Sequence, residues 1–332
     1  MSYADKLFKE TCRDILVNGT DTKGSEARLH AGPFWEDTGK CAYTIKKFGV
    51  INRYDLRKEF PAITLRRIAL KNAMDEILWI FQKKSNNIYD LRSHIWDQWA
   101  DETGSIGKAY GYQFQKKHCY GDITLDGLKK AFPKGHLEEY PEIDIMLFVG
   151  SDVMSTNKRT VYAACMKGAW HMDQVNKVIY DLQNTPFSRR ILTSTYNFED
   201  LHDMALYPCA YSMTFNVMNT EEGPVLNAIL NQRSQDMLAA NGWNVAQYAL
   251  LLMMLAQICH MIPGELVHVI ADAHIYDRHI PMIEELLSRK EYPAPKVWLN
   301  PDIDDFYDFT VNDLHVENYV TGEQIRNIPI AV

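Results

Sequence analysis

The spacing of apolar residues predicts several helices along the chain. Within residues 3–17, Leu7, Cys12 and Ile15 recur at roughly helical spacing, and Gly19 is a stop signal. The most apolar helix is expected over residues 243–261 and should be buried. Further helices are expected over residues 67–82, 171–183 and 280–287.

Segments rich in β-branched and aromatic residues predict strands between these helices. They cover residues 190–196, 211–218, 225–230 and 266–270. Glu221-Glu222-Gly223 lies between two of them as a turn. The strands and helices mix without a regular βαβ rhythm, which indicates an α+β fold.

One segment differs from its surroundings. Residues 116–167 are rich in Lys, Gly, Asp and Tyr and are interrupted by Pro133 and Pro141. We interpret them as an insertion or small subdomain on the surface of a single domain that spans residues 1–332.

The composition of the chain argues against several classes of protein. The 332 residues are 46% hydrophobic, 23% charged and carry a net charge of -8, which argues against a protein whose main work is nonspecific nucleic-acid binding. The N-terminus lacks the apolar stretch of a signal peptide, and the longest apolar run, residues 246–262, is interrupted by polar residues. The six cysteines are scattered, so we expect no disulfide framework, no metal site and a reducing cytoplasm.

Cys209 lies in Tyr207-Pro208-Cys209-Ala210-Tyr211. Pro208 biases its neighbour towards extended structure, so Cys209 should stand at a strand start. On this local pattern alone, a buried structural cysteine is the commoner role and a nucleophile the rarer one.

Nearby residues provide anion-binding chemistry. Arg233 and Ser234 are adjacent and can grip a phosphate, and Arg189-Arg190 precede an apolar segment, which favours the mouth of a site over a solvated face. Arginines close to a thiol lower its pKa, which would favour the thiolate of Cys209.

Two further groups have both a structural and a functional interpretation. Asn244 precedes the most apolar helix and is either a plain N-cap or a ligand-reading amide. His274 and Tyr276 are two residues apart, so in a strand both point to one face. They are either satisfied core residues or a pair that binds sugar hydroxyls.

Taken together, the motifs resemble the thymidylate synthase family. YPCAY, NQRSQDM, GWNVAQYALLLMMLAQ and DAHIYDRH occur in that family's order and nearly at its spacing, as do DEILW, HIWDQWADE, GKAYG, PFSRR and the closing IAV. The resemblance covers nearly the whole chain apart from the insertion. It implies a mixed β-sheet covered by helices and a homodimer that forms through this sheet.

The resemblance also implies an activity, namely reductive methylation of dUMP to dTMP with 5,10-methylenetetrahydrofolate as cosubstrate and no metal. The Cys209 thiolate would add to C6 of uracil, making C5 a nucleophile towards the folate methylene. Tyr110 would help to remove the C5 proton, and Glu76 would organise water and proton transfers. Asn244 would donate to O4 and accept from N3–H, favouring uracil over cytosine.

Binding roles follow from the same resemblance. The phosphate would be held by Arg233, Ser234 and a pair lent across the dimer interface, Arg189 and Arg190, with Arg28 as the candidate from the N-terminal loop. His274 and Tyr276 would bind the ribose 3′-hydroxyl. Asp236 is expected at both substrates, and the folate side would comprise Arg66, Trp96, Trp99 and Ala331.

The sequence departs from the family's pattern at two places. Ala210 stands where histidine is frequent, and Ala240-Asn241-Gly242 replaces glycine, an aliphatic residue and proline. Two alternatives remain at this point. One is a deoxyuridylate hydroxymethylase that finishes with water rather than hydride, and the other is a catalytically silent nucleotide- or RNA-binding protein on the same scaffold.

Overall fold

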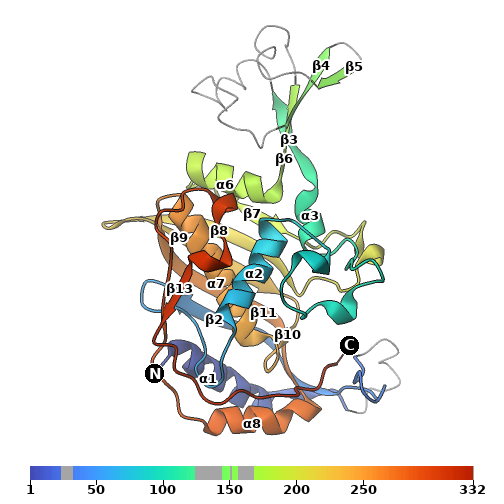
Figure 1. Cartoon of the computed structure of the whole chain (residues 1–332), viewed down its shortest axis with the longest axis vertical. Coiled ribbons are helices and arrows are strands. Elements are labelled where there is room, and N and C mark those ends of the chain that lie inside the picture. The colour runs from blue at the N-terminus through green and yellow to red at the C-terminus, as the bar shows by residue number, and fades with distance from the viewer. Residues whose placement is uncertain (24–32, 124–143, 150–151, 156–167, 332) are drawn as a thin grey trace.

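The structure is a computed structural model that describes the chain except residues 24–32, 124–143, 150–151, 156–167 and 332. Its centre is a seven-stranded sheet in the order β1-β2-β11-β9-β8-β7, with β10 paired to β11 (Figure 1). Pairs β9–β11 and β10–β11 are parallel and the others are antiparallel. The strands are β1 (Thr20–Asp21), β2 (Thr44–Asp55), β7 (Leu192–Ser194), β8 (Ala210–Thr220), β9 (Gly223–Gln232), β10 (Gln235–Asp236) and β11 (Ile262–Tyr276).

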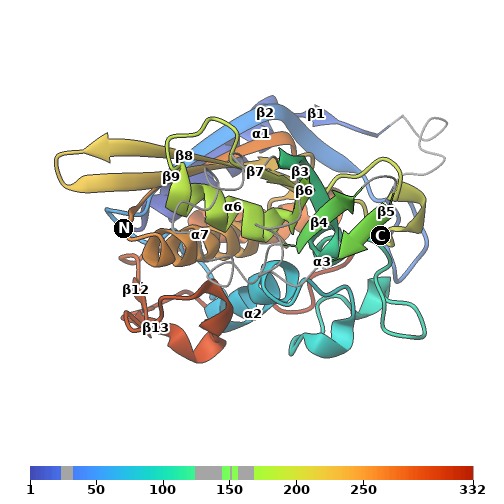
Figure 2. The ribbon, with the colours of Figure 1, turned by 90° about the horizontal axis from the view of Figure 1, so that it is seen from above.

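Helices cover one face of this sheet. Helix α7 (Asn241–Ile258) packs on β9 and β11, α1 (Tyr3–Asn18) packs on β2, and α2 (Leu70–Phe81) packs on the far side of α7 (Figure 2). The remaining α-helices of the described chain are α3 (Gly111–Gln115), α6 (Gln174–Asn184) and α8 (Ile280–Ser288). The expected α+β class and helix-covered mixed sheet are thus confirmed.

The opposite face of the sheet is open and partly apolar. Ile51, Ile229 and Leu192 are 59%, 39% and 51% exposed. The strand register connects them across the sheet, because Val269 pairs with Ile51, Val267 with Ile229, and Thr214 with both Ile229 and Leu192. The uncovered face therefore carries a row of apolar side chains that this chain does not bury.

Most expected elements are present with shifted ends. Helix α6 starts at Gln174 rather than 171 because residues 168–173 form a strand, and α2 starts three residues later than predicted. Strand β2 was not predicted, and β11 extends well beyond the expected 266–270.

A second, four-stranded sheet projects from the body at the top of Figure 1, in the order β3-β6-β4-β5. It consists of β3 (Lys117–Ile123), β4 (Asp144–Val149), β5 (Asp152–Ser155) and β6 (Gly168–Asp173). It falls largely in the segment interpreted as an insertion, part of which lies outside the described residues. An antiparallel pair of β12 (Lys296–Leu299) and β13 (Leu314–Glu317) completes the strands of the described chain.

Candidate active site

A pocket of about 1200 Å³ opens where β8, β9, β10 and β11 meet the start of α7. Its walls also include the segment of residues 94–99 and the C-terminal segment of residues 328–331. Segments from residues 22–110 and 206–331 converge here, so tertiary structure alone brings the predicted site residues together.

Cys209 directly precedes β8 and lines this pocket, half-buried, as the proline pattern predicted. The Arg233 guanidinium donates to the backbone carbonyls of Tyr207 and Pro208, at 2.6 and 3.2 Å, and thereby fixes the loop that carries the thiol. Burial raises the pKa of Cys209, and the positive charge of Arg233 offsets this only in part. The expected lowering of the thiol pKa by a nearby arginine is thus present, but desolvation outweighs this single arginine.

Tyr110 lies beside the thiol. Its Oη accepts a hydrogen bond from the backbone N–H of Cys209 at 3.0 Å. Burial raises the pKa of Tyr110 well above its usual value, and the nearby Cys209 adds to this, so the phenol stays protonated. Its backbone φ of 43° is unusual for a bulky side chain, which indicates that the surrounding packing holds it in place.

Glu76 projects from α2 into the pocket and is buried. Two indoles hold its carboxylate: Trp96 Nε1 donates to Oε1 at 2.7 Å and Trp243 Nε1 donates to Oε2 at 2.5 Å. Burial raises the pKa of Glu76, while these two hydrogen bonds and one from Gln247 act in the opposite direction. A raised carboxyl pKa suits a group that exchanges protons near neutral pH.

Asn244 faces the pocket from the first turn of α7. The N-cap interpretation is wrong, because α7 begins at Asn241 and its N-cap is Ala240. Asn244 Oδ1 accepts from Gln232 Nε2 at 3.5 Å, and Nδ2 donates to Gln247 Oε1 at 3.4 Å. Behind it, Gln232 Oε1 contacts His268 Nε2 at 2.5 Å, and burial lowers the pKa of His268 to about 3. A neutral His268 that donates to Gln232 leaves the Gln232 amide N–H to face Asn244, which orients the Asn244 amide.

His274 and Tyr276 lie at the end of β11, and both line the pocket with ring centroids 5.0 Å apart. Their predicted placement on one face is confirmed. Asp236 lies on the neighbouring β10, paired with His274. Burial would raise the pKa of Asp236, but the ion pair with His279 and the charge of His274 lower it overall, so the group is a carboxylate.

The pocket gathers most of the predicted site residues and leaves a few outside. Lining it are Cys209, Glu76, Tyr110, Asn244, Arg233, Ser234, Asp236, His274, Tyr276, Trp96, Trp99 and Ala331. Arg66 is buried elsewhere, donating to the Leu238 carbonyl at 2.5 Å. Arg189 and Arg190 are exposed in the turn before β7 and are not among the lining residues. Arg28 lies outside the described residues.

Sequence reasoning missed several polar residues of the pocket. Trp243 and Gln247 contact Glu76 or Asn244 from α7, and Gln232 reaches Asn244 from β9. One signal was present: Gln247 is a polar residue three positions after Asn244 in the most apolar helix, so the two share a helix face. His279 and Pro329, which contact each other, carried no such signal.

Comparison with known proteins settles the family. A family model described as thymidylate synthase matches residues 6–332. The chain belongs to the thymidylate synthase family. It is 33% identical to the thymidylate synthase of Bacillus mojavensis and 33% identical to that of Bacillus phage phi3T, each over 98% of both chains. Among solved structures it resembles the thermostable thymidylate synthase A from Bacillus subtilis, with a TM-score of 0.75, 31% identity and 99% of both chains covered.

The two departures from the thymidylate synthase pattern both lie at the pocket. Ala210 and Ala240 line it. Gly242 packs closely, since a Cβ there would lie 2.9 Å from Ile63 Cδ1. The altered loop therefore supplies a small side chain to the pocket and a tight contact to the core.

Proposed function

We propose that the chain is a methyltransferase that converts dUMP to dTMP with 5,10-methylenetetrahydrofolate as carbon and hydride donor. The observation that carries this proposal is the convergence of Cys209, Tyr110, Glu76 and Asn244, from four separate segments, on one pocket with three tryptophans in its wall. A pure binding protein would need neither a pocket-facing thiol nor a buried carboxylate beside it.

In this proposal Cys209 forms a covalent bond to C6 of the uracil ring, which makes C5 a carbon nucleophile. C5 bonds to the folate methylene as the first of its two C–N bonds breaks, and C5 then loses its proton to solvent with the help of Tyr110. The folate nitrogen leaves, the tetrahydrofolate returns a hydride to the exocyclic methylene, and the C6–sulfur bond breaks. The products are dTMP, dihydrofolate and the free thiol.

The remaining residues bind and orient the substrates. Arg233 and Ser234 hold the phosphate next to the loop that Arg233 already fixes, and His274 and Tyr276 hold the 3′-hydroxyl. Asn244 selects uracil, because the orientation imposed by Gln232 and Gln247 presents one acceptor and one donor. Trp96 and Trp99, whose ring centroids are 5.4 Å apart, form the wall against which the folate ring packs.

The proposed assembly is a homodimer formed through the open face of the central sheet. Ile51, Ile229 and Leu192 provide apolar surface there. Arg189 and Arg190 lie just before β7, which is an edge strand of the sheet, and they reach the phosphate in the partner subunit's site. This assignment explains why both side chains are exposed and do not line the pocket of their own subunit.

We place the enzyme in the cytoplasm. The five described cysteines are free, as in a reducing compartment. In the described part of the chain, none of the helices has the length and apolarity needed to span a membrane.

The test is turnover of dUMP in the presence of 5,10-methylenetetrahydrofolate. We expect dihydrofolate to form, seen by absorbance, together with a nucleotide heavier by CH2. A gain of CH2O without dihydrofolate would identify a hydroxymethylase instead. Cys209→Ser is the matched control, and it should bind dUMP without turnover. If the folded wild-type protein also binds dUMP without turnover, the silent binding protein is the correct interpretation.

A further inference from the structure

The C-terminal segment is docked on the pocket by three backbone contacts. The Ile330 carbonyl accepts from the Glu36 N–H at 3.0 Å, Ala331 pairs with Trp35 in a β-bridge, and the Pro329 carbonyl lies 2.8 Å from His279 Nε2. In two of these contacts the partner of the C-terminal segment is the backbone of the loop that carries Trp35 and Glu36. In the third, the partner is a side chain. That side chain is His279.

His279 also faces the Asp236 carboxylate. Its Nδ1 lies 3.5 Å from Asp236 Oδ2, at the distance of an ion pair, and is buried with no hydrogen-bond partner among the described residues. The other oxygen of Asp236 accepts from the N–H groups of Leu238 and Ala239, at 2.8 and 3.1 Å. Asp236 thus turns one oxygen to the backbone of its own loop and the other to His279.

Only one protonation state of His279 satisfies both neighbours. Pro329 offers a carbonyl and Asp236 offers a carboxylate, and both groups can only accept. A neutral imidazole has a single N–H. The charged carboxylate is the stronger acceptor and draws that N–H to Nδ1, so Nε2 would turn a lone pair towards the Pro329 carbonyl. The imidazolium has two N–H groups and can donate to both.

We propose that His279, as an imidazolium, is a positioning residue that fastens the C-terminal segment over the pocket to the Asp236 carboxylate at the pocket's edge. This contact positions both the C-terminal segment and the Asp236 carboxylate. It therefore links the closure of the site to the protonation of a residue that contacts neither substrate.

The surroundings of His279 support this charge state. Burial alone would lower the pKa of His279, but the Asp236 carboxylate, the Pro329 carbonyl and the charge of Asp277 raise it overall above the ordinary 6.5. The other groups against it are the aromatic rings of Trp35 and Tyr276, at 5.6 and 5.4 Å between centroids. Because the pKa in the docked state is raised, the contact is complete at low and neutral pH. It is lost as the pH rises through that raised value.

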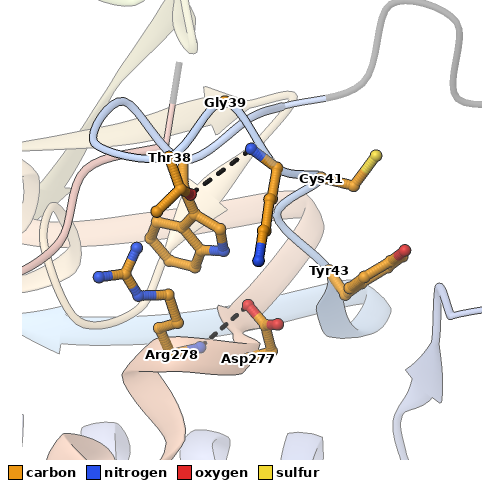
Figure 3. Close-up of a pocket in the computed structure, with 8 residues that line it drawn as sticks. Thr38, Gly39, Cys41, Tyr43, Asp277 and Arg278 are labelled. Atoms are coloured by element: carbon orange, nitrogen blue, oxygen red, sulfur yellow. Dashed lines mark hydrogen bonds between the residues drawn. The ribbon is translucent and has the colours of Figure 1, made fainter.

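The loop that receives the tail is held independently from its outer side. Arg278 stacks 4.6 Å from the Trp35 ring centroid and pairs with Asp37 at 2.7 Å. Figure 3 shows Arg278 and Asp277 facing Thr38 and Gly39 across a cavity of about 630 Å³ on this side. Loss of the His279 contact should therefore release the tail without unfolding the loop.

The first test follows the docked tail directly and needs no turnover. The Glu36 amide is protected from hydrogen exchange while Ile330 accepts its hydrogen bond, and mass spectrometry with electron-transfer fragmentation resolves single amides. After division by the intrinsic exchange rate, we expect protection of Glu36 to fall by about tenfold as the pH rises from about 6 to about 9. Protection that is constant over this range would overturn the proposal.

Two isosteric variants separate the two contacts. His279→Gln places an amide N–H near the position of Nε2, so the tail should stay docked and its protection should lose its pH dependence. His279→Asn places the amide N–H near Nδ1, so protection of Glu36 should be low at every pH. His315→Gln, on β13 and stacked on Trp298 away from the pocket, is the control and should keep the wild-type profile. Wild-type protection and pH dependence in His279→Asn would contradict the proposal.

The kinetic consequence rests on the proposed methyltransferase function. We expect His279→Asn to raise KM for the folate several-fold with little change in KM for dUMP, because the tail residue assigned to a substrate, Ala331, lies on the folate side. An unchanged folate KM in His279→Asn would remove the functional part of the proposal. Absence of turnover in the wild type with intact, pH-dependent tail protection would refute the proposed function and leave the tail contact standing.

Discussion

At the scale of single residues, the Glu76 carboxylate in the pocket is held by partners that can only donate hydrogen bonds. Glu76 has an indole N–H on each carboxylate oxygen, and indoles donate without accepting. Both contacts therefore favour the ionised carboxylate against the effect of burial. Trp243 is the less expected of the two donors, since nothing in its sequence position marked it as a partner of Glu76.

We predict that Trp243→Phe moves the acid limb of the pH–kcat profile to higher pH. The change removes one donor from a buried carboxylate whose pKa is already raised, so the ionised form is harder to keep. It should also lower the free energy of unfolding by about 1–3 kcal/mol. The control is Trp298→Phe on β12. An acid limb at the wild-type position in Trp243→Phe would show that Glu76 ionisation does not depend on this indole.

Substrate choice should depend on the Asn244 amide. A carboxylate in its place accepts from the exocyclic amine of cytosine but repels O4 of uracil, so we predict that Asn244→Asp shifts preference towards dCMP by about tenfold or more. Competition between dUMP and dCMP, read as the ratio of kcat/KM values, measures this. Unchanged selectivity for dUMP would exclude the role assigned to Asn244.

The sequence predicted the identity of these residues better than their contacts. Cys209, Asn244 and His274 were found because their motifs are ordered like a family's. The effect of Arg233 on the Cys209 pKa was predicted, but the larger effect of burial was not, because the degree of burial of a side chain depends on segments distant in the sequence. The orientation of Asn244 on α7 likewise depends on His268, which lies on β11.

At the scale of elements, turns and strand irregularities position the site. The segment from Gly107 to Gly111 carries Tyr110 at positive φ between two tightly packed glycines. A Cβ on Gly107 would lie 1.9 Å from the Asp203 carbonyl oxygen, and one on Gly111 would lie 2.1 Å from that of Ser85. The backbone is therefore clamped on both sides of the tyrosine.

Comparison of two glycine variants should isolate this clamp. Gly107→Ala adds a steric clash to the strain of a φ of +69°, whereas Gly39→Ala, with φ of +62° and open space around it, adds the strain alone. We predict a loss of about 1 kcal/mol in unfolding free energy for Gly39→Ala and of about 3 kcal/mol or more for Gly107→Ala. Only Gly107→Ala should also lower kcat. Urea denaturation and steady-state kinetics check both, and equal losses in the two variants would contradict the clamp.

Irregular strands also explain which elements the sequence could not predict. Leu266, His268 and Ile270 are fully buried, but beyond Ala271 the fully buried residues are Ala273 and Ile275. The alternation therefore changes phase within β11, and β2 changes phase near Gly49 beside it. A search for period-two alternation loses the strand at that point. The same change of phase turns His274 and Tyr276 towards the pocket.

At the scale of the whole molecule, the open sheet face and the two arginines outside the pocket are both consistent with one kind of dimer. The exposed apolar side chains on the sheet would be stabilised if a second subunit covered them. Arg189 and Arg190 lie at the edge of this sheet, outside the pocket of their own subunit. A dimer that buries this face gives both features a purpose. No sequence pattern could show which face stays uncovered, because that depends on where the helices pack.

Subunit mixing distinguishes shared sites from independent ones. Cys209→Ser and the double variant Arg189→Glu/Arg190→Glu should each be inactive as homodimers. If the arginines act across the interface, a mixed dimer contains one site with both its thiol and its arginines, and exchange should restore up to about a quarter of wild-type activity. If they act within their own subunit, neither site of the mixed dimer is intact and no activity returns.

The central claim is that Cys209 bonds to C6 of the uracil ring, and trapping that bond tests it most directly. A 5-fluoro analogue of dUMP cannot lose its C5 substituent as a proton, so the reaction with 5,10-methylenetetrahydrofolate should stall with the nucleotide and the folate attached. Mass spectrometry of the digested protein should then find their summed mass on the peptide that contains Cys209, and Cys209→Ser should carry none. Absence of this adduct in folded wild-type protein, or its appearance on another residue, would contradict the account.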